Sequence, residues 1–300
     1  MARLSLVPIK GNTYYIPCPT NIGIYIENRE ATIIDSGLDK DVAKQILRLL
    51  EENKWVLKRI INTHSHADHI GGNAFLCEKT KCHVITSKEE AHFIQNPLLE
   101  PALLYGGFPH KVLKNKFLMA KASYVTQIVE APTVLVDTQL EIISLKGHSI
   151  DMIGVKTPDN ILFIGDSLFP EDILSKYSLT YLWDVRASID TINTLKTIYA
   201  DLFVPSHGQP IQEVAGLCNV NENKLMEITD VIHEFCAEEV TTEEALQKLC
   251  IHYDTKLNAT QYVLLLSTLR SYLSYLCDEG KIEASYEQQR LTWHKKANIN

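Results

Sequence analysis

A cluster of four metal-binding side chains within six residues constrains the fold of this chain more than any other feature. His64, His66, Asp68 and His69 directly follow an apolar run, residues 57–61, that indicates a buried strand. In an extended segment, residues two apart project to the same side, so His64 and His66 can reach one ion. A helix beginning at the cluster would turn Asp68 and His69 toward a second ion. The fold must therefore place a strand end and a helix start together at an open edge.

Strand-like and helix-like segments alternate through the first two thirds of the chain, which is typical of an α/β fold. Residues 22–27 and 31–35 indicate a hairpin, and residues 39–53 have the apolar spacing of a helix. Ser87 and Glu90 occupy the positions of a capping box at the start of another short helix. The remaining predictions are strands at 82–86, 133–136, 141–145, 151–156, 161–165 and 202–204, a helix near 70 and a helix at 188–200.

Residues 96–125 do not follow this alternation. Proline and glycine residues interrupt the segment, and its periodicity is poor. We expect an insertion at about 96–125 that lies over the surface and is helical in pieces. Tyr105, Phe108 and Lys111 of this insertion, together with residues 177–183, are candidates for the wall of a ligand pocket.

From about residue 221 the sequence predicts mainly helices. The patterns indicate helices at 221–237, after a capping box of Thr241 and Glu244, and at 259–279 after a cap at Asn258, followed by a β-hairpin at 281–286 and 290–294. Three helices closed by a two-stranded wing predict a winged-helix-like module. We therefore divide the chain into a first domain, residues 1–215, and a second domain, residues 216–300.

The composition excludes several classes of protein. The chain has 300 residues with a net charge of −8, and 45% are hydrophobic, so it can form a core and lacks a generally basic surface. Its seven cysteines form no CxxC pair, which indicates reduced thiols rather than a disulfide framework or a zinc ribbon. The N-terminal segment has no apolar core of signal-peptide length before Lys10, and no apolar run approaches the length of a membrane span. We therefore expect a cytoplasmic protein without membrane partners.

Three further candidate ligands each follow a predicted strand. They are His148 in a Gly-His-Ser segment, Asp166 in a Gly-Asp-Ser segment and His207 in a Ser-His-Gly segment. Each segment alone fits an ordinary turn. An α/β sheet brings such strand ends to one edge, so the three residues are expected to lie close to the histidine cluster. This common location strengthens the prediction that they are ligands.

These motifs, in this order and with Asp35 after an early strand, resemble the metallo-β-lactamase superfamily, and especially its glyoxalase II-like hydrolases. The resemblance extends over residues 22 to about 210. It implies an αββα sandwich, in which two sheets lie face to face with helices outside and metal ions at one edge.

The resemblance also assigns roles to individual residues. It implies that His64, His66 and His148 hold a first metal ion, that Asp68, His69 and His207 hold a second, and that Asp166 bridges both. Asp35 would not be a ligand; it would orient a ligand or its loop, or cap a turn.

The predicted ligand set indicates the chemistry of the site. Imidazole and carboxylate ligands suit two zinc ions, and they also admit iron or manganese. Two such ions about 3.5–4 Å apart lower the pKa of a shared water and generate hydroxide at neutral pH. We expect this hydroxide to attack an ester, thioester or phosphoester of a small molecule, with Asp68 aiming the water.

Two alternatives remain open from the sequence. A mononuclear iron enzyme that resembles persulfide dioxygenases would use His64, His148 and Asp166. A non-catalytic metal-binding interaction or regulatory protein would act through the C-terminal module instead. Against that second alternative, a decayed site is expected to have lost at least one of the seven ligands.

The predicted helix at 259–279 bears on possible partners. Arg270 is its only cation, whereas Tyr262, Leu265, Leu269 and neighbouring residues give it an apolar face. A helix that reads DNA needs cations for phosphate contacts, so nucleic acid is not an expected partner. The apolar face predicts packing on the first domain or a homodimer contact.

Overall fold

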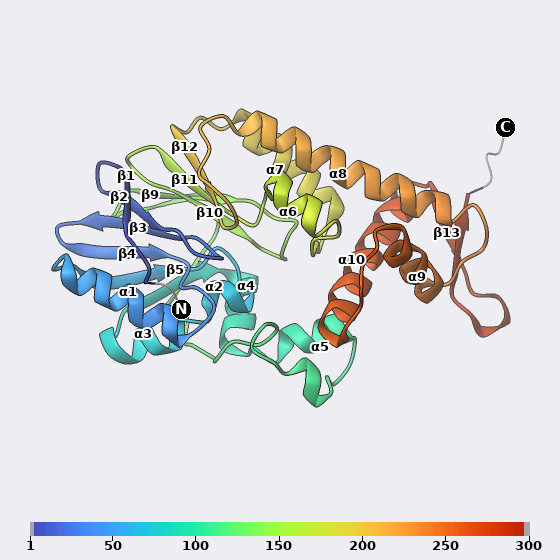
Figure 1. Cartoon of the computed structure of the whole chain (residues 1–300), viewed down its shortest axis with the longest axis horizontal. Coiled ribbons are helices and arrows are strands. Elements are labelled where there is room, and N and C mark those ends of the chain that lie inside the picture. The colour runs from blue at the N-terminus through green and yellow to red at the C-terminus, as the bar shows by residue number, and fades with distance from the viewer. Residues whose placement is uncertain (1–2, 297–300) are drawn as a thin grey trace.

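A computed structural model describes residues 3–296, so the ends of the two predicted domains, residues 1–2 and 297–300, lie outside the described part. Two β-sheets stack face to face, and helices cover the outer side of each sheet (Figure 1). The predicted αββα arrangement is confirmed.

The strands of each sheet place the predicted ligands at one edge. The first sheet has the order β1-β2-β3-β4-β5-β6-β7, with the bounds Val7–Lys10, Thr13–Ile16, Ile22–Glu27, Glu30–Ile34, Val56–Ile61, His83–Ser87 and Gln127–Val129. The second has the order β12-β11-β10-β9-β8, formed from β8 Thr133–Leu135, β9 Leu140–Ser144, β10 Ile153–Lys156, β11 Ile161–Gly165 and β12 Leu202–Pro205. The strands from β4 to β7 are parallel, as are β11 and β12, so their carboxyl ends meet along common edges.

Alternating side chains on the inner strands build two cores at once. Ile33 of β4 and Ile60 of β5 pack against the helices outside the first sheet, whereas Ile34 and Ile61 point between the two sheets. The helices of the described chain are α1 Lys40–Glu52, α2 Ala67–Ile70, α3 Asn73–Thr80, α4 Lys88–Gln95, α5 Leu99–Tyr105, α6 Glu171–Lys176, α7 Val185–Thr197, α8 Val214–Phe235, α9 Thr242–His252 and α10 Ala259–Asp278. The elements β1, β2, β7 and α6 were not predicted from the sequence.

The helix expected near residue 70 is two short helices, α2 and α3, with Gly71 and Gly72 between them. The backbone of this junction lies against the loop that follows β4. A Cβ added at Gly71 would stand 1.9 Å from the carbonyl oxygen of Leu38, so only glycine allows this approach. The break lets Asp68 and His69 occupy a single short helical turn after β5, in which His69 is buried and Asp68 is partly exposed.

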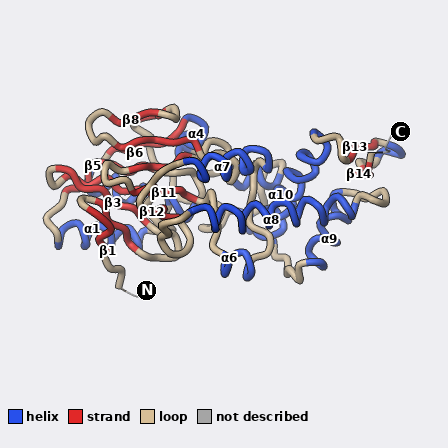
Figure 2. The backbone as a smooth tube through the Cα atoms, turned by 90° about the horizontal axis from the view of Figure 1, so that it is seen from above, coloured by secondary structure: helices blue, strands red, loops and turns tan. Residues whose placement is uncertain are grey.

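A single long helix, α8, joins the two parts of the chain. Its first residues, including Val214 and Cys218, pack on the second sheet, whereas Ile228 and Ile232 pack with α9 and α10. Figure 2 shows α8 running from the sheets to the C-terminal elements. The prediction that this helix begins at 221 was wrong because its apolar face continues without a break from one core to the other. Its first turn contains residue 216, where the second domain was expected to begin.

The C-terminal elements follow in the predicted order. The helix α9 begins with the predicted capping box of Thr241 and Glu244, and Asn258 caps α10. A two-stranded sheet of β13 (Ile282–Ser285) and β14 (Thr292–Lys295) closes the chain. The apolar face of α10, including Leu269 and Leu273, is buried in the core that these elements share with the segment before α7.

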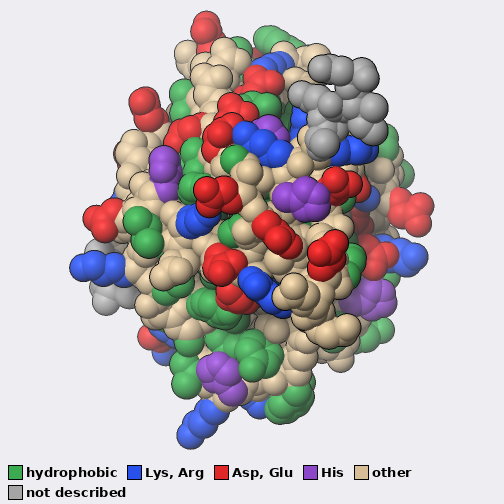
Figure 3. Space-filling model, turned by 90° about the vertical axis from the view of Figure 1, so that its right-hand side faces the viewer, with side chains coloured by type: hydrophobic (Ala, Val, Ile, Leu, Met, Phe, Trp, Pro, Cys, Tyr) green, Lys and Arg blue, Asp and Glu red, His purple; other side chains and the backbone are tan. Residues whose placement is uncertain are grey.

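Acidic and basic side chains are interspersed on the described surface at this end of the molecule (Figure 3). Within residues 3–296, none of the helices is both long and apolar enough to pass through a lipid bilayer.

The segment 96–125 forms a connection between the sheets and the C-terminal elements. It contains α5 and a 3₁₀ turn at Lys111–Leu113, and its buried residues Leu104, Leu113 and Leu118 pack with Val263 of α10. Figure 1 shows α5 beside α10, at a distance from the two sheets.

Candidate metal centre

His64, His66 and His148 bring three ring nitrogens together at the edge of the sandwich. The first two lie in the loop between β5 and α2, and His148 lies in the loop after β9. Nδ1 of His66 is 3.0 Å from Nε2 of His64 and 3.0 Å from Nε2 of His148. Lone pairs on three nitrogens this close can converge on one ion, so these residues form a candidate metal-binding group, called here the first group.

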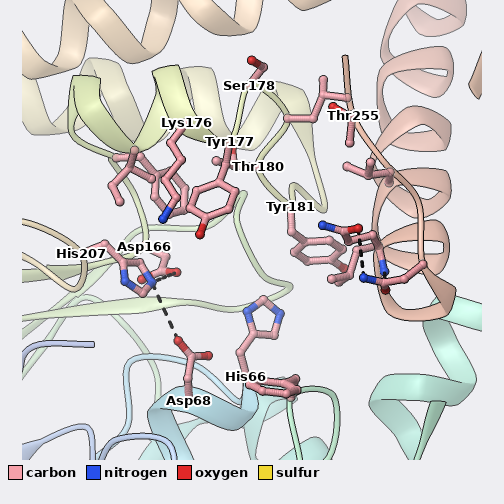
Figure 4. A pocket seen from close by; sticks show the side chains of 18 of the residues that line it. His66, Asp68, Asp166, Lys176, Tyr177, Ser178, Thr180, Tyr181, His207 and Thr255 are labelled. Carbon is pink, nitrogen blue, oxygen red and sulfur yellow. Dashed lines mark hydrogen bonds and ion pairs between the residues drawn. The ribbon is translucent and has the colours of Figure 1, made fainter. Parts of the chain in front are cut away.

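Asp68, His69 and His207 form a second group beside the first. Asp68 and His69 lie on α2, and His207 follows β12. Oδ2 of Asp68 is 3.7 Å from Nε2 of His69 and 3.8 Å from Nε2 of His207. Figure 4 shows the contact between Asp68 and His207 across the floor of a pocket. These three atoms are close enough to bind one ion together.

Asp166, which follows β11, lies between the two groups. Its Oδ2 is 3.4 Å from Nε2 of His148 and 3.3 Å from Nε2 of His207. Its Oδ1 is 3.4 Å from Nε2 of His69. The carboxylate therefore has the position expected of a bridge, and all seven residues named from the sequence lie in one cluster.

Two atoms of this cluster indicate that it fits metal ions. Nε2 of His69 and Oδ1 of Asp166 are the buried side-chain atoms of residues 3–296 that have no hydrogen-bond partner. Leaving a buried polar atom unpaired costs about 1–3 kcal/mol, so such atoms are rare in folded proteins. A cation between these two atoms would pair both, and the imidazole and carboxylate donors around them suit a divalent ion.

Backbone carbonyls orient two of the histidines from outside the cluster. Nδ1 of His148 lies 3.1 Å from the carbonyl oxygen of Tyr181, and Nδ1 of His207 lies 2.7 Å from that of Pro19. A carbonyl oxygen can only accept, so Nδ1 carries the proton in both rings. Each Nε2 therefore faces the centre of the cluster, and in the neutral ring it has its lone pair there.

Asp35 orients one histidine of each group. Its carboxylate accepts a 2.8 Å hydrogen bond from Nδ1 of His69 and bonds of 2.8 Å from the backbone N–H and the hydroxyl of Thr63. Because the Thr63 hydroxyl donates to Asp35, it accepts from Nδ1 of His64 at 3.0 Å. Asp35 itself has a φ of 62°, a strained value for a residue with a side chain. The structure therefore places Asp35 outside the cluster, hydrogen-bonded to His69 directly and to His64 through Thr63.

Glu90 connects the loops that carry the first group. It lies on α4 and is 1% exposed. One carboxylate oxygen accepts a 2.9 Å hydrogen bond from the Ser65 backbone, and the other accepts from the Ser149 hydroxyl at 2.7 Å and the Asp151 backbone at 2.9 Å. The predicted capping box was wrong, because these buried donors hold the Glu90 carboxylate and the Ser87 hydroxyl donates to the Asp151 carbonyl.

Glu100 of α5 lies on the outer side of His66. Its Oε1 is 3.6 Å from Nε2 of His66, and the residue is 9% exposed. Burial raises the pKa of Glu100 to about 8, and the nearby Glu90 adds to this shift. Neither glutamate was predicted as part of the site, since neither belongs to a ligand motif and both act through tertiary contacts.

Burial and charge divide the histidines into two classes. Burial lowers the pKa of His66 to about 4 and that of His148 to about 3, which leaves both rings neutral. Burial also disfavours protonation of His207, but Asp166 and Asp68 outweigh it and raise the pKa of His207 to about 9. Similarly, the pKa of His69 lies well above its ordinary value because three carboxylates outweigh its burial. Without an ion, the second group therefore carries protons that the first group lacks.

A cavity of about 840 Å³ opens above the cluster. His66, Asp68, Asp166 and His207 line its floor, and residues 176–181 and 253–258 line its walls. The Lys176 and Tyr177 side chains point into it above the cluster (Figure 4). The prediction that residues 177–183 line a ligand pocket is therefore confirmed for residues 177–181.

The insertion contributes to this cavity through other residues than those expected. Phe117 and Leu118 line it, whereas Tyr105, Phe108 and Lys111 do not, so that part of the prediction was wrong. Phe108, which follows α5, is 75% exposed.

Curated proteins named hydroxyacylglutathione hydrolase are similar to this chain. The protein from Rhodopseudomonas palustris (strain BisB18) is 30% identical over 150 residues, which are 50% of this chain and 48% of that protein. The protein from Bradyrhizobium sp. (strain ORS 278) is 29% identical over 171 residues, 56% of this chain and 57% of that protein. The chain thus spans about half the length of the curated relatives it matches.

Solved structures share the fold over nearly the whole chain. A beta-lactamase domain protein from Burkholderia ambifaria superposes with a TM-score of 0.78 at 15% identity, covering 97% of this chain and 94% of that one. A metallo-beta-lactamase family protein from Thermus thermophilus superposes with a TM-score of 0.74 at 17% identity, covering 99% of both chains.

The match to a family extends over the whole sandwich and the metal centre. Residues 15–207 match the family described as the metallo-beta-lactamase superfamily, and this range includes all seven clustered residues and Asp35. The chain belongs to the metallo-beta-lactamase superfamily.

Proposed function

We propose that this protein is a dinuclear metal-dependent hydrolase that cleaves an ester, thioester or phosphoester bond of a small molecule. The observation that carries the proposal is the position of Asp166 between the two groups, with one of its buried oxygens unpaired opposite Nε2 of His69. Zinc is the first choice of metal because the donors are imidazole and carboxylate, with iron or manganese as alternatives.

When bound, two divalent ions would supply a water of lowered pKa and would stabilise negative charge on the substrate. The side chains of the protein would position the water and the substrate. The Thr20 hydroxyl donates a 2.8 Å hydrogen bond to Oδ2 of Asp68, and Asp68 lines the cavity. Asp68 is therefore held in a position where it can accept a hydrogen bond from a water on the cavity floor and aim it at the substrate.

The cavity wall offers donors for the substrate. Lys176 and Tyr177 both point toward the floor (Figure 4). We propose that they donate hydrogen bonds to an oxygen or sulfur atom of the bond that is cleaved. A thiolate leaves without full protonation, so two donors of this kind are sufficient for a thioester.

The cavity and the relatives direct the choice of substrates. A volume of about 840 Å³ is within the range that holds a single small molecule. The relatives' name, hydroxyacylglutathione hydrolase, makes acylated glutathione the first substrate to test. All seven cysteines are free, in keeping with a reducing compartment, and we propose a cytoplasmic location.

Metal analysis of protein purified without added metal, combined with a substrate panel, tests this function. The panel contains acylated glutathione, other thioesters, a lactone and a phosphodiester. We expect two equivalents of divalent metal and turnover of one class, abolished in His66→Ala and in Asp166→Ala with the fold retained. One iron per chain with oxygen uptake on a persulfide would replace the proposal with the dioxygenase, and full activity in either variant would overturn the site.

A further inference from the structure

The two ring nitrogens of His66 face different neighbours. Nδ1 faces the other two histidines of the first group, each at 3.0 Å. If Nδ1 gives its lone pair to an ion, Nε2 must carry the ring proton. Nε2 points outward and lies 3.6 Å from Oε1 of Glu100, so this carboxyl oxygen is placed to accept a hydrogen bond from Nε2–H when Nδ1 binds an ion.

The C-terminal helix α10 holds Glu100 in this place. Glu100 lies in the first turn of α5, and Leu104, four residues later on the same helix, is 1% exposed. Leu104 packs with Val263 of α10 in a cluster that also contains Leu113 and Leu118. The position of the Glu100 carboxylate therefore depends on how α5 packs against α10.

The same helix holds the support of His148. The carbonyl oxygen of Tyr181 accepts from Nδ1 of that ring at 3.1 Å. The next two residues are tied to α10, because Thr268 accepts from the Leu182 backbone at 3.2 Å and Ser271 donates to the Trp183 carbonyl at 2.7 Å. Two of the three histidines in the first group are thus oriented through α10.

The second group has its outer supports elsewhere. Asp35 orients His69, Thr20 orients Asp68, and the carbonyl of Pro19 orients His207. All three supports lie in loops next to the first sheet, and none belongs to α5 or to α10. Asp35 also reaches His64 of the first group through Thr63, so the two groups share this support. They differ in that only the first group has supports that depend on α10.

We propose that Glu100 is a positioning residue for His66, and that α10 acts through Glu100 and the Tyr181 carbonyl to set metal affinity at the first group but not at the second. This inference rests on the proposed function, since it needs an ion at each group. It gives the C-terminal elements a role at the metal centre in addition to lining the cavity.

Metal titration of variants that keep only one group tests the inference. His207→Ala leaves the first group as the intact site, and His66→Ala leaves the second. Adding Glu100→Ala to His207→Ala should weaken cobalt or zinc binding by about 10–100-fold and shift the cobalt absorption bands. Adding Glu100→Ala to His66→Ala should leave affinity and spectrum unchanged. Affinities come from competition with a chromophoric chelator, so no substrate is needed.

Three further variants complete the test: one that should restore affinity, one matched control and one that acts on the α10 contact. Glu100→Gln keeps the side-chain volume and an acceptor oxygen, so it should recover most of the affinity lost in Glu100→Ala. Glu89→Ala removes an exposed carboxylate of α4 and should change neither group. Thr268→Val removes the acceptor for the Leu182 N–H, and it should weaken the first group alone.

The outcomes separate the inference from the proposed function. If the unsubstituted protein binds two ions but Glu100→Ala leaves the first group unchanged, or weakens both groups equally, the inference is overturned and the hydrolase proposal stands. If the unsubstituted protein binds no divalent ion at the cluster, both are overturned.

Discussion

Oδ2 of Asp35 lies 2.8 Å from Nδ1 of His69, and both side chains are almost completely buried. This hydrogen bond directs Nε2 of His69 toward Asp166, where both facing atoms lack a hydrogen-bond partner in the described chain. In the proposed metal centre, this carboxylate would hold His69 in the orientation that a ligand needs before a cation binds.

Replacing Asp35 should weaken the second group. In Asp35→Asn, the amide NH₂ would face the groups that donate to the carboxylate, so we expect metal affinity at the second group to fall by about 10–100-fold. Chelator competition in the His66→Ala background measures this change. Asp41→Asn, at a largely exposed residue, is the matched control and should have no effect. Unchanged affinity in Asp35→Asn would contradict the orienting role.

Removing the Glu90 carboxylate should destabilise the protein without removing a ligand. Glu90→Ala leaves two backbone N–H groups and one hydroxyl without their acceptor, and we expect a loss of about 2–4 kcal/mol in the free energy of unfolding. Urea denaturation of the metal-free protein measures it. Glu89→Ala should stay within about 0.5 kcal/mol of the parent protein. A loss of only about 0.5 kcal/mol in Glu90→Ala would contradict the claim that Glu90 holds the two loops together.

Metal binding should be linked to protons at one group only. The pKa of His66 is lowered to about 4 and that of His148 to about 3, so at neutral pH the first group has no proton to release. The pKa of His207 is raised to about 9, so an ion must displace its proton at neutral pH. Affinity at the second group should therefore rise with pH until about 9, whereas affinity at the first should stay level around neutral pH, below the pKa of Glu100 of about 8.

Calorimetry in buffers of different ionisation enthalpy measures these protons directly. The His66→Ala protein, with the second group intact, should release about one proton or more per ion at neutral pH. The His207→Ala protein, with the first group intact, should release almost none. The reverse pattern would contradict the assignment of charge to the two groups.

Removing bound metal should lower the thermal stability. An ion that binds only the folded state adds about 2.7 kcal/mol when its free concentration is a hundred times its dissociation constant. Treatment with a chelator should lower the melting temperature, and zinc should restore it. Asp166→Ala should make the melting temperature much less sensitive to both treatments; equal sensitivity would place the stabilising ion elsewhere.

The residues that follow strands were predictable from the sequence. Asp166, His207 and His148 lie one, two and four residues after a strand of the second sheet. The ends of these strands lie at one edge of the sheet, which brings the three residues together. The two histidines of the first loop share one side because they are two residues apart in extended backbone.

The residues that orient the ligands were not predictable in the same way. Glu90 matches a local capping pattern, but the donors that hold its carboxylate come from Ser65 and from the loop of Ser149 and Asp151, which are distant in the sequence. Glu100 lies in an irregular insertion, and its place depends on the packing of Leu104 against α10. Local patterns do not record tertiary contacts of this kind.

Anomalous X-ray diffraction at the zinc absorption edge tests the central claim most directly. Crystals grown with zinc should give two anomalous peaks about 3.5–4 Å apart, one enclosed by His64, His66 and His148 and the other by Asp68, His69 and His207. Asp166 should lie between the two peaks. A map without peaks in this cluster, or with its zinc peaks outside it, would contradict the account.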